Sequence, residues 1–474
     1  MKKIADVCNE KITKINNRKI AGVEWILVGV IAFFMYSTMF YEDLIIIYHH
    51  SLTWLDSLFS GDLANFYGNT LENSVNGVGA VYYWTVYFVV GVWNLPIWIL
   101  HKLFEINMYS VKCMLWMKIE IVFFFVLAIR MMGLVLNECK LSKEKCRWGL
   151  FMFISALTVL VPVMATAQVD IITVFLMLWG IKEYLKSDKV TWKFLLIFSF
   201  AGSLKVFALF IMIPLILLKE KRIIHVLIDL LCGLIFTISS IVPYGWRTDY
   251  HESSDFLNEI MTERLFLAVF PAGNADIPIF ISLLVAIFVW AYIKKLETLE
   301  EYYYYVPWIG LLVFANFFIF VFAHPYWIVL LAPFVVLVMS QNVKDVKVNM
   351  ILEFFINLLI MVFYIATFGV FMMEYSFDYL IFPKFGINKN GGYTGLQDLL
   401  IQKELYDYMP VVFGLFVVCL VAFIILNYPG RTYKLAKMEA NKNIDEKYDY
   451  GMIVLRIVVL GVYILGNIYF AYIG

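Results

Sequence analysis

An aspartate at the end of the first long apolar stretch could act as a base. Asp43 closes the sequence Phe40-Tyr41-Glu42-Asp43, and the loop that follows holds further acids but no lysine or arginine before Lys102. A carboxylate held at such a boundary can take the proton of a hydroxyl group. The alternative is that Glu42 and Asp43 only mark the transition to water. We retain Asp43 as the candidate base.

Two polar residues lie in a short turn between later apolar stretches, and a lysine interrupts the next stretch. Asp170, two positions after Gln168, could cap the following helix by accepting hydrogen bonds from its free N–H groups, and a capping carboxylate can also face a site. Lys205 interrupts the apolar stretch 192–218. Its ammonium group needs an anionic partner, such as Asp43, Asp170 or a lipid phosphate. The alternative is a lysine that extends its amine to the membrane surface.

Cationic candidates also occur in two later turns. His324 precedes Pro325, which suits the first turn of a helix, and a histidine there could donate to a phosphate or pair with a carboxylate. An isolated histidine in a turn needs no such role. Arg247, His251 and Arg264 share one loop, and guanidinium groups bind phosphate through paired hydrogen bonds. Which of them binds a phosphate stays open, and Arg264 is our candidate. The alternative is that all three lie on a solvated face of the loop.

Motifs for nucleotide or zinc chemistry are absent from the sequence. It contains no phosphate-binding loop, no dinucleotide-binding glycine motif and no HExxH motif. The six cysteines form no CxxC pair, which disfavours a structural zinc site. A divalent metal held by carboxylates stays open. Lys118 and Glu120 lie two positions apart, so they face different sides of a helix, and we expect each to have a partner on another helix.

The composition shows where these residues must be held. Of the 474 residues 62% are apolar and 16% charged, and the mean hydropathy is +0.81. Soluble domains are about 45–50% apolar and about 25% charged. A soluble enzyme, a disordered or fibrous chain and a nucleic-acid binder are therefore excluded. The sequence predicts an all-α polytopic membrane protein, without a cleavable signal peptide, because the first apolar stretch is long enough to stay in the bilayer.

The apolar stretches predict about eleven full transmembrane helices plus one hairpin of two short helices. A spanning helix needs about 20 mostly apolar residues. The predicted spans are 22–40, 113–136, 149–165, 171–186, 223–243, 277–293, 303–322, 326–341, 350–372, 410–427 and 452–473.

Basic residues concentrate on the cytoplasmic side of membrane proteins, so they predict the topology. The lysine-rich segment 1–21 is expected in the cytoplasm. A single crossing by the apolar stretch 80–100 would place the basic loop 137–148 outside. We therefore expect 80–100 to form in-plane helices within one long external loop, 41–111.

The same argument applies to the second ambiguous stretch, 192–218. A single crossing would place Lys219, Lys221 and Arg222 outside. We therefore expect two half-helices that enter from the cytoplasm and return, with Lys205 at the outer tip. Few basic residues then remain outside: Lys102, Arg247, Arg264, Lys384, Lys389 and Lys403.

Three parts of the chain follow from this topology. Segment 1–21 is cytoplasmic, 22–341 is a transmembrane module with the external loop 41–111, and 342–474 holds the remaining helices with the external loop 373–409. We predict a multi-pass plasma-membrane protein with a cytoplasmic N-terminus.

The order of the polar residues resembles the GT-C superfamily of integral-membrane glycosyltransferases, particularly bacterial mannosyltransferase-like enzymes that use polyprenyl-phosphate sugars. The shared features are an acid after the first helix, a long external first loop with in-plane helices, a Gln-x-Asp turn, an apolar hairpin with a lysine and a proline, and a His-Pro-Tyr turn before a further proline. Here they are Asp43, 41–111, Gln168 and Asp170, Lys205 and Pro214, and His324, Pro325, Tyr326 and Pro333.

The resemblance covers roughly residues 20–340, with two departures. Ala167 stands where many relatives have glycine, and Tyr82-Tyr83-Trp84 stands near the position of a tyrosine-proline-proline element. The C-terminal helices vary in such families.

The resemblance implies transfer of a hexose or mannose-like sugar from a polyprenyl-phosphate donor to a lipid-linked or surface glycan acceptor on the external face, in a bacterium. Asp43 would be the catalytic base. Lys205, His324 and Arg264 would bind the donor phosphate. Gln168 and Asp170 would orient the acceptor or a metal.

Two other functions stay open. A transporter or flippase for a lipid-linked or polar solute would have internal repeats and broken helices at mid-membrane, and the sequence shows no repeat. An O-antigen-type polymerase would use an oligosaccharide donor. No nucleic-acid partner is expected; membrane lipids are.

Overall fold

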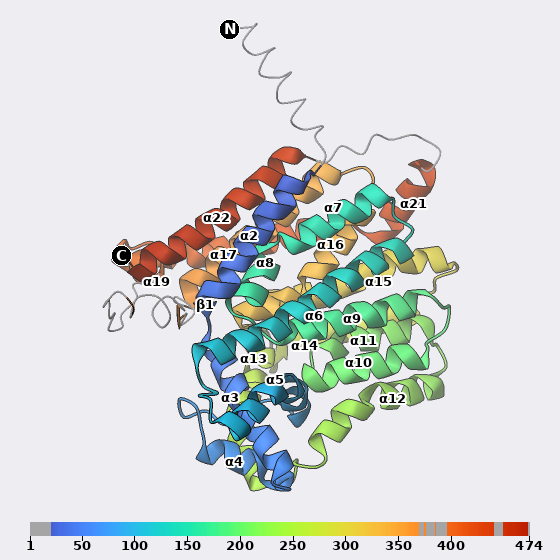
Figure 1. Ribbon diagram of the computed structural model, residues 1–474. Helices are drawn as coiled ribbons and strands as arrows, with labels where there is room; N and C mark the ends of the chain where they lie inside the picture. The colour runs from blue at the N-terminus through green and yellow to red at the C-terminus, as the bar shows by residue number, and fades with distance from the viewer. Residues whose placement is uncertain (1–19, 369–373, 376–383, 385–395, 440–448, 473–474) are drawn as a thin grey trace, which may run out of the picture.

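The computed structural model describes residues 20–368, 374–375, 384, 396–439 and 449–472, and these are almost entirely helical (Figure 1). The first half of the chain contains α2 (Gly22–Thr38), β1 (Met39–Phe40), α3 (Glu42–Phe59), η1 (Leu63–Asn65), α4 (Phe66–Glu72), α5 (Trp84–Phe104), α6 (Val111–Glu138), α7 (Lys143–Ile154), α8 (Leu157–Leu160), η2 (Val161–Ala165), α9 (Asp170–Leu185), α10 (Trp192–Leu204), α11 (Ala208–Lys219) and α12 (Ile223–Ile241).

The second half continues with helices and three short strands. Its elements are α13 (Thr248–Phe266), β2 (Val269–Ala272), β3 (Ala275–Pro278), α14 (Ile279–Ile293), α15 (Leu299–Phe320), η3 (Pro325–Leu330), α16 (Ala332–Gln341), α17 (Val346–Thr367), β4 (Glu374–Tyr375), α19 (Leu396–Gln402), η5 (Tyr406–Tyr408), α20 (Met409–Leu426), α21 (Pro429–Glu439) and α22 (Tyr450–Tyr472).

Long apolar sequences form helices here because a helix satisfies its own backbone polar groups without water. Among the described residues, seven helices are long and apolar enough to cross a membrane: α5, α6, α12, α15, α17, η5–α20 and α22. An eighth candidate is bent by 58° between α7 and the α8–η2 segment. The predicted all-α polytopic class is confirmed. The predicted count of eleven spans stays a prediction, because α2, α14 and other apolar helices are shorter.

One end of the helix bundle gathers the loops that were predicted to be cytoplasmic. Arg147, at the start of α7, donates to the carbonyl of Ile20 at 2.6 Å. Arg431 pairs with Asp345 at 3.1 Å. These contacts join segments far apart in the sequence, as the predicted topology requires. Which side of a membrane this end faces stays a prediction.

The opposite end gathers segments that were predicted to be external. β1, directly after α2, pairs antiparallel with β4, with Phe40 opposite Glu374. Tyr326, at the start of η3, contacts Asp43. The segments around residues 40, 326 and 374 therefore lie at the same end.

Helices α10 and α11 form a hairpin instead of one straight span. The side chain of Lys219, the last residue of α11, donates to the carbonyl of Ser187 just before α10, at 2.6 Å. The start of α10 and the end of α11 therefore lie side by side. Lys205 lies at the opposite end of the hairpin, in the break between the two helices. The two short helices predicted for 192–218 are present, whereas their entry from the cytoplasmic side stays a prediction.

Helices α3, α4, α5 and α13 form a separate layer at the bottom of Figure 1. α3 and α5 pack closely, and Gly91 of α5 permits this because a Cβ there would lie 3.0 Å from the Trp54 ring. Trp98 donates to Asp56 at 2.9 Å across the same interface. α5 is apolar enough to span, so its predicted in-plane orientation stays a prediction.

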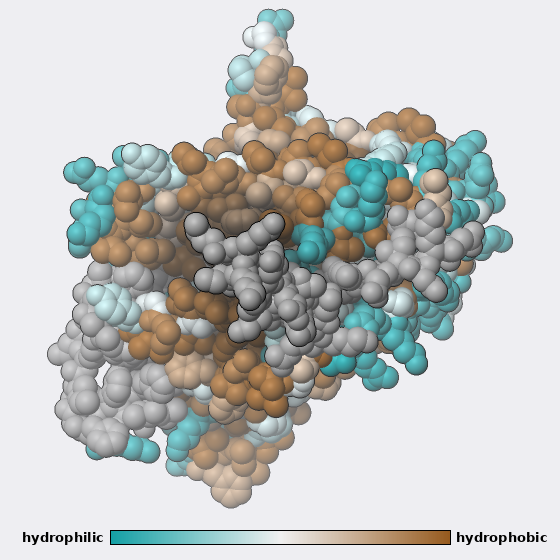
Figure 2. Space-filling view, turned by 90° about the horizontal axis from the view of Figure 1, so that it is seen from above, coloured by the Kyte–Doolittle hydropathy of each residue, from teal (hydrophilic) through white to brown (hydrophobic). Residues whose placement is uncertain are grey.

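The surface seen from above is apolar across its middle, and hydrophilic residues gather toward its two ends (Figure 2). Many large apolar side chains on the outer faces are exposed, among them Phe33 at 68% and Leu231 at 63%. Exposed apolar surface of this extent is typical of helices that face lipid.

A buried ionic cluster ties the last helix to the bundle. Arg456 of α22 pairs with Glu353 of α17 and donates to the hydroxyl of Ser155 at 3.0 Å and to the carbonyl of Met152 at 2.7 Å. Asn357 donates to Glu353 at 2.8 Å. Both charges are almost fully buried, so each depends on these partners.

Candidate functional site

Asp43 lies in the first turn of α3, and its carboxylate accepts a hydrogen bond from the hydroxyl of Tyr326 at 2.5 Å. The extended residues of β1 turn the chain from α2 into α3, which sets the position of the carboxylate. Burial raises the pKa of Asp43, while the hydrogen bond from Tyr326 and the charge of Lys205 act in the opposite direction. A carboxylate with a raised pKa is a stronger base once ionised.

Lys205 and Asp170 form an ion pair, with 3.3 Å between Nζ and Oδ1. The side chain of Asp170 is fully buried and that of Lys205 is 8% exposed. Nζ also lies 4.9 Å from the ring centre of Tyr82 and 4.8 Å from that of Trp327, distances typical of cation–π contacts. Of the anionic partners considered for Lys205, the structure shows Asp170, and the charge of Lys205 also acts on Asp43.

The turn that carries Gln168 and Asp170 has an unusual backbone. The π-helical turn η2 precedes it, and the Gln168 N–H donates back to the carbonyl of Pro162 at 3.0 Å. Ala167 has φ of +51°, in the left-handed region that favours glycine. Asp170 is the first residue of α9, directly after the N-cap residue Val169. The carboxylate lies in the first turn of α9 and also faces Lys205, so the capping role and the site role do not exclude each other.

His324 and Arg264 lie beside this cluster. The His324 ring stacks on Tyr326 with centres 5.4 Å apart, and the Arg264 guanidinium lies 5.1 Å from the centre of the Phe322 ring. Burial, together with the positive charges of Arg264 and Lys205, lowers the pKa of His324 to about 3. The imidazole is neutral at pH 7, so it can donate a hydrogen bond but brings no charge.

Several buried polar atoms around the cluster have no hydrogen-bond partner among the described residues. They are Gln168 Oε1, Arg264 Nη1, His324 Nδ1 and Trp327 Nε1. Buried polar groups are normally paired, so such a group of unpaired atoms needs an explanation, and a polar ligand is one.

Lys118 supports the site from the neighbouring helix α6. Its ammonium group is fully buried and donates to the carbonyl of Met39 in β1 at 2.6 Å, between the rings of Tyr36 and Phe40. The expected partner on another helix is thus a backbone carbonyl. For Glu120 the expectation is wrong, because neither carboxylate oxygen has a hydrogen-bond partner among the described residues.

The other loop candidates lie apart from the cluster. Arg247 pairs with Asp249 at 3.0 Å, and His251 with Asp255 at 3.3 Å. Arg264 is the one of the three whose charge acts on His324.

Tyr82, Tyr326 and Trp327 belong to the site, and only two of them carried a sequence signal. Tyr326 follows the His-Pro pair, and Tyr82 stands in the Tyr-Tyr-Trp run after the first loop's acids. Neither was assigned a role. Trp327 gave no signal, because tryptophan is common in this chain.

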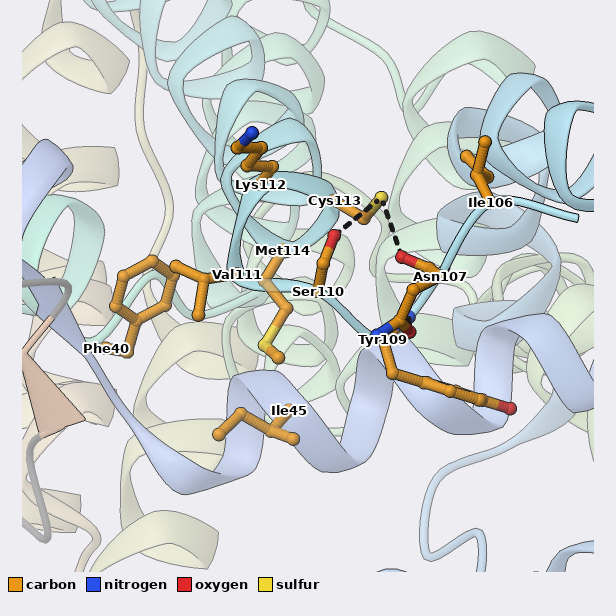
Figure 3. A pocket seen from close by; sticks show the side chains of 10 residues that line it. All are labelled: Phe40, Ile45, Ile106, Asn107, Tyr109, Ser110, Val111, Lys112, Cys113 and Met114. Atoms are coloured by element: carbon orange, nitrogen blue, oxygen red, sulfur yellow. Dashed lines mark hydrogen bonds between the residues drawn. The ribbon is translucent and has the colours of Figure 1, made fainter. Parts of the chain in front are cut away.

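A mainly apolar pocket of about 670 Å³ lies on the flank of α3 (Figure 3). Phe40 and Ile45 lie on one side, and Figure 3 shows Val111 and Met114 of α6 facing them across the gap. Asp43 does not line it, but Phe40 and Ile45 bracket Asp43 in the sequence. The pocket therefore offers apolar surface next to the segment that carries the carboxylate.

The described residues contain no group of three or more His, Cys, Asp or Glu side chains that could hold a metal ion. Asp43 is hydrogen-bonded to Tyr326, and Asp170 is already neutralised by Lys205. A bound cation would have to displace the lysine, so the donor set does not fit a metal site of this kind.

The cluster thus combines a partly desolvated carboxylate with two fixed cations and a neutral imidazole at one end of the bundle. Comparison of the chain with models of known families finds no match, and comparison with curated proteins finds no relative. The resemblance to GT-C enzymes rests on the residues themselves.

Proposed function

We propose that the protein is a membrane glycosyltransferase that moves a sugar from a polyprenyl-phosphate donor to a hydroxyl group of a glycan acceptor at the external face. The observation that supports this most is the juxtaposition of Asp43 with the Asp170–Lys205 pair, from segments far apart in the sequence. A base and a cation side by side suit attack by a hydroxyl and departure of a phosphate.

Asp43 acts on the acceptor in this proposal. The acceptor oxygen forms a bond to the anomeric carbon of the donor sugar, and Asp43 takes the hydroxyl proton. The bond between the anomeric carbon and the phosphate oxygen breaks, and its electron pair leaves with polyprenyl phosphate. Tyr326 keeps the carboxylate aimed through its hydrogen bond.

Lys205, Arg264 and His324 act on the phosphate. The phosphate gains negative charge as it leaves, and fixed cations in a buried site stabilise that charge without reorganising. Lys205 and Arg264 supply charge, and neutral His324 supplies an N–H donor. Asp170 holds Lys205 in place when no phosphate is bound.

The pocket between α3 and α6 suits the donor's apolar chain. A polyprenyl chain stays in the bilayer while its phosphate reaches the membrane surface, so it needs apolar surface that ends near the polar cluster. Phe40, Ile45, Val111 and Met114 provide such surface.

A reconstitution assay tests the proposal. Purified protein in lipid nanodiscs is incubated with polyprenyl-phosphate hexoses labelled in the sugar, with and without glycolipids from the native membrane. Acceptor-dependent release of free polyprenyl phosphate is expected, and Asp43→Asn should abolish it. Asp255→Asn, on the exposed face of α13, is the matched control and should retain it. Full activity of a folded Asp43→Asn protein would remove the base assignment.

The transporter alternative predicts a different result. A transporter would move a labelled solute across sealed vesicles without breaking a glycosidic bond. Proteoliposomes that take up or flip the intact donor, with no polyprenyl phosphate formed, would favour it over the transferase.

A further inference from the structure

A second cleft, polar in contrast to the apolar pocket beside α3, lies between α4 and the segment that joins α12 to α13. Its volume is about 580 Å³, and it is open to solvent. Pockets of roughly 300–1,000 Å³ are the size that binds small molecules. The residues that line it are Asn65, Gly68, Asn69, Glu72, Trp246, Arg247, Thr248 and Asp249.

Hydrogen bonds hold the two walls of the cleft together across more than 170 residues of sequence. Arg247 donates to Asn65 Oδ1 at 2.7 Å and to Asp249 Oδ1 at 3.0 Å. Asp249 in turn accepts from the N–H of Gly68 at 3.2 Å. A Cβ at Gly68 would lie 3.4 Å from the same carboxylate, so α4 approaches it closely. The polar wall is therefore fixed before any ligand binds.

Trp246 supplies an apolar face to this polar wall. Its side chain is 75% exposed, the largest exposed fraction of any large apolar residue described. The C–H groups on one face of a sugar ring pack favourably on an aromatic ring, while the ring's hydroxyl groups need amide and carboxylate partners. Glu72 and Asn69 line the same cleft and can supply such partners, whereas the Asn65 amide is already bonded to Arg247 and Asp62.

The charges in the cleft disfavour an anionic ligand. Arg247 is already neutralised by Asp249, and Glu72 leaves one negative charge in excess among the lining residues. Phosphate groups would be repelled, whereas a neutral ligand with many hydroxyl groups would not.

We propose that this cleft is a carbohydrate-binding site for a neutral oligosaccharide. In the framework of the proposed function, on which the identity of that oligosaccharide rests, it holds the distal sugars of the acceptor. The fold links the two regions: Tyr67 of α4 packs on Tyr244 and donates to the carbonyl of Tyr82 at 2.9 Å, and the Tyr82 ring faces Lys205.

Binding of neutral oligosaccharides to the purified full-length protein tests the inference. Linear hexasaccharides of glucose, mannose, galactose and N-acetylglucosamine are titrated by calorimetry without any donor. At least one is expected to bind, and Trp246→Ala should weaken it about ten-fold or more. Trp246→Phe should retain most of the affinity because it keeps an aromatic face. A galacturonate hexamer should bind more weakly than the neutral sugars.

Trp192→Ala is the matched control, because Trp192 is also 67% exposed but lies at the other end of the bundle, at the start of α10. It should leave binding unchanged. If Trp246 serves only as an anchor at the membrane surface, no hexasaccharide binds or Trp246→Ala binds equally well, and either result overturns the inference.

The Asp43→Asn variant separates this inference from the proposed function. It should bind the oligosaccharide as the wild type does while losing transfer. Sugar binding without any transferase activity would refute the transferase and leave the cleft assigned. Sugar transfer by a protein that binds no oligosaccharide at Trp246 would refute the cleft assignment and leave the proposed function standing.

Discussion

The hydroxyl of Tyr326 donates to the carboxylate of Asp43 across 283 positions of sequence, at 2.5 Å. Since η3 reaches α3 through this bond, the start of α3 is fixed by a turn near residue 325. A hydrogen bond to the ionised form of a carboxylate lowers its pKa, which opposes the rise caused by burial. Burial, the hydrogen bond from Tyr326 and the charge of Lys205 therefore act together on the pH at which Asp43 can accept a proton.

Removal of this hydroxyl should shift the pH dependence of transfer. A base must be ionised, so activity should rise with pH through a pKa above the ordinary value of Asp. Tyr326→Phe removes a hydrogen bond to the ionised Asp43 carboxylate, so the pKa of Asp43 should rise. The acidic side of the pH profile should then move to higher pH, and activity should persist above that pKa. The measurement is the pH profile of kcat/KM. Tyr36→Phe, which removes a bond to the Leu115 carbonyl, is the control and should not move the limb.

The buried Lys205–Asp170 pair should couple strongly in a double-mutant cycle. Removing one partner of a buried pair leaves an uncompensated charge and costs about 3–5 kcal/mol. Lys205→Met or Asp170→Asn should therefore lower the free energy of unfolding more than the double variant does. Transfer should be lost in all three. Thermal unfolding in detergent measures stability, and additive losses would contradict the pair.

The buried Arg456–Glu353 pair should affect stability without affecting chemistry. Arg456→Met should destabilise by about 3–5 kcal/mol, and the added Glu353→Met should recover part of the loss. The exposed pair Arg431–Asp345 is the control, and its removal should cost about 0–1 kcal/mol. Unchanged transfer by the folded double variant would agree with a purely structural role.

Glycine at position 167 should be tolerated or stabilising. A left-handed conformation costs an L-residue about 1–2 kcal/mol, and glycine removes this cost. Part of the benefit is lost because glycine has more conformational entropy in the unfolded state. Ala167→Gly should therefore raise stability by up to about 1 kcal/mol, and Ala167→Val should lower it. Ala165→Gly, within the preceding turn, should destabilise by about 0.5–1 kcal/mol. Destabilisation by Ala167→Gly would contradict the observed backbone.

Cysteine labelling in intact cells tests which end of the bundle is external. In a background without native cysteines, Ser142→Cys should not react with an impermeant maleimide, whereas Glu105→Cys should react. Both positions are exposed in the structure. Reaction at 142 would reverse the predicted orientation.

The sequence predicted the charged part of the cluster because charges are rare within apolar stretches. Lys205 stood out for that reason, and Asp43 and Asp170 stood out at the ends of apolar stretches. The hairpin was predicted from other charges, those of Lys219, Lys221 and Arg222. Trp327 could not stand out in a chain of 18% aromatic residues, and the Tyr-Tyr-Trp run that holds Tyr82 did not reveal a role for it. The partner of Lys118 is a backbone carbonyl, which no pattern of charges reveals.

Apart from 80–100 and 192–218, where basic residues decided, the predicted spans depended on the length of apolar stretches, which does not detect local breaks. The bend of 58° between α7 and α8 divides one predicted span, and the left-handed Ala167 ends the next turn.

The hairpin with Lys205 at its tip also constrains how the chain enters the bilayer during translation. α9 precedes the hairpin, so Asp170 leaves the ribosome 35 positions ahead of Lys205. The carboxylate is then in place to neutralise the ammonium group when the translocon releases the hairpin. Loss of Asp170 should therefore reduce membrane yield during biogenesis, before any folded protein exists to be assayed.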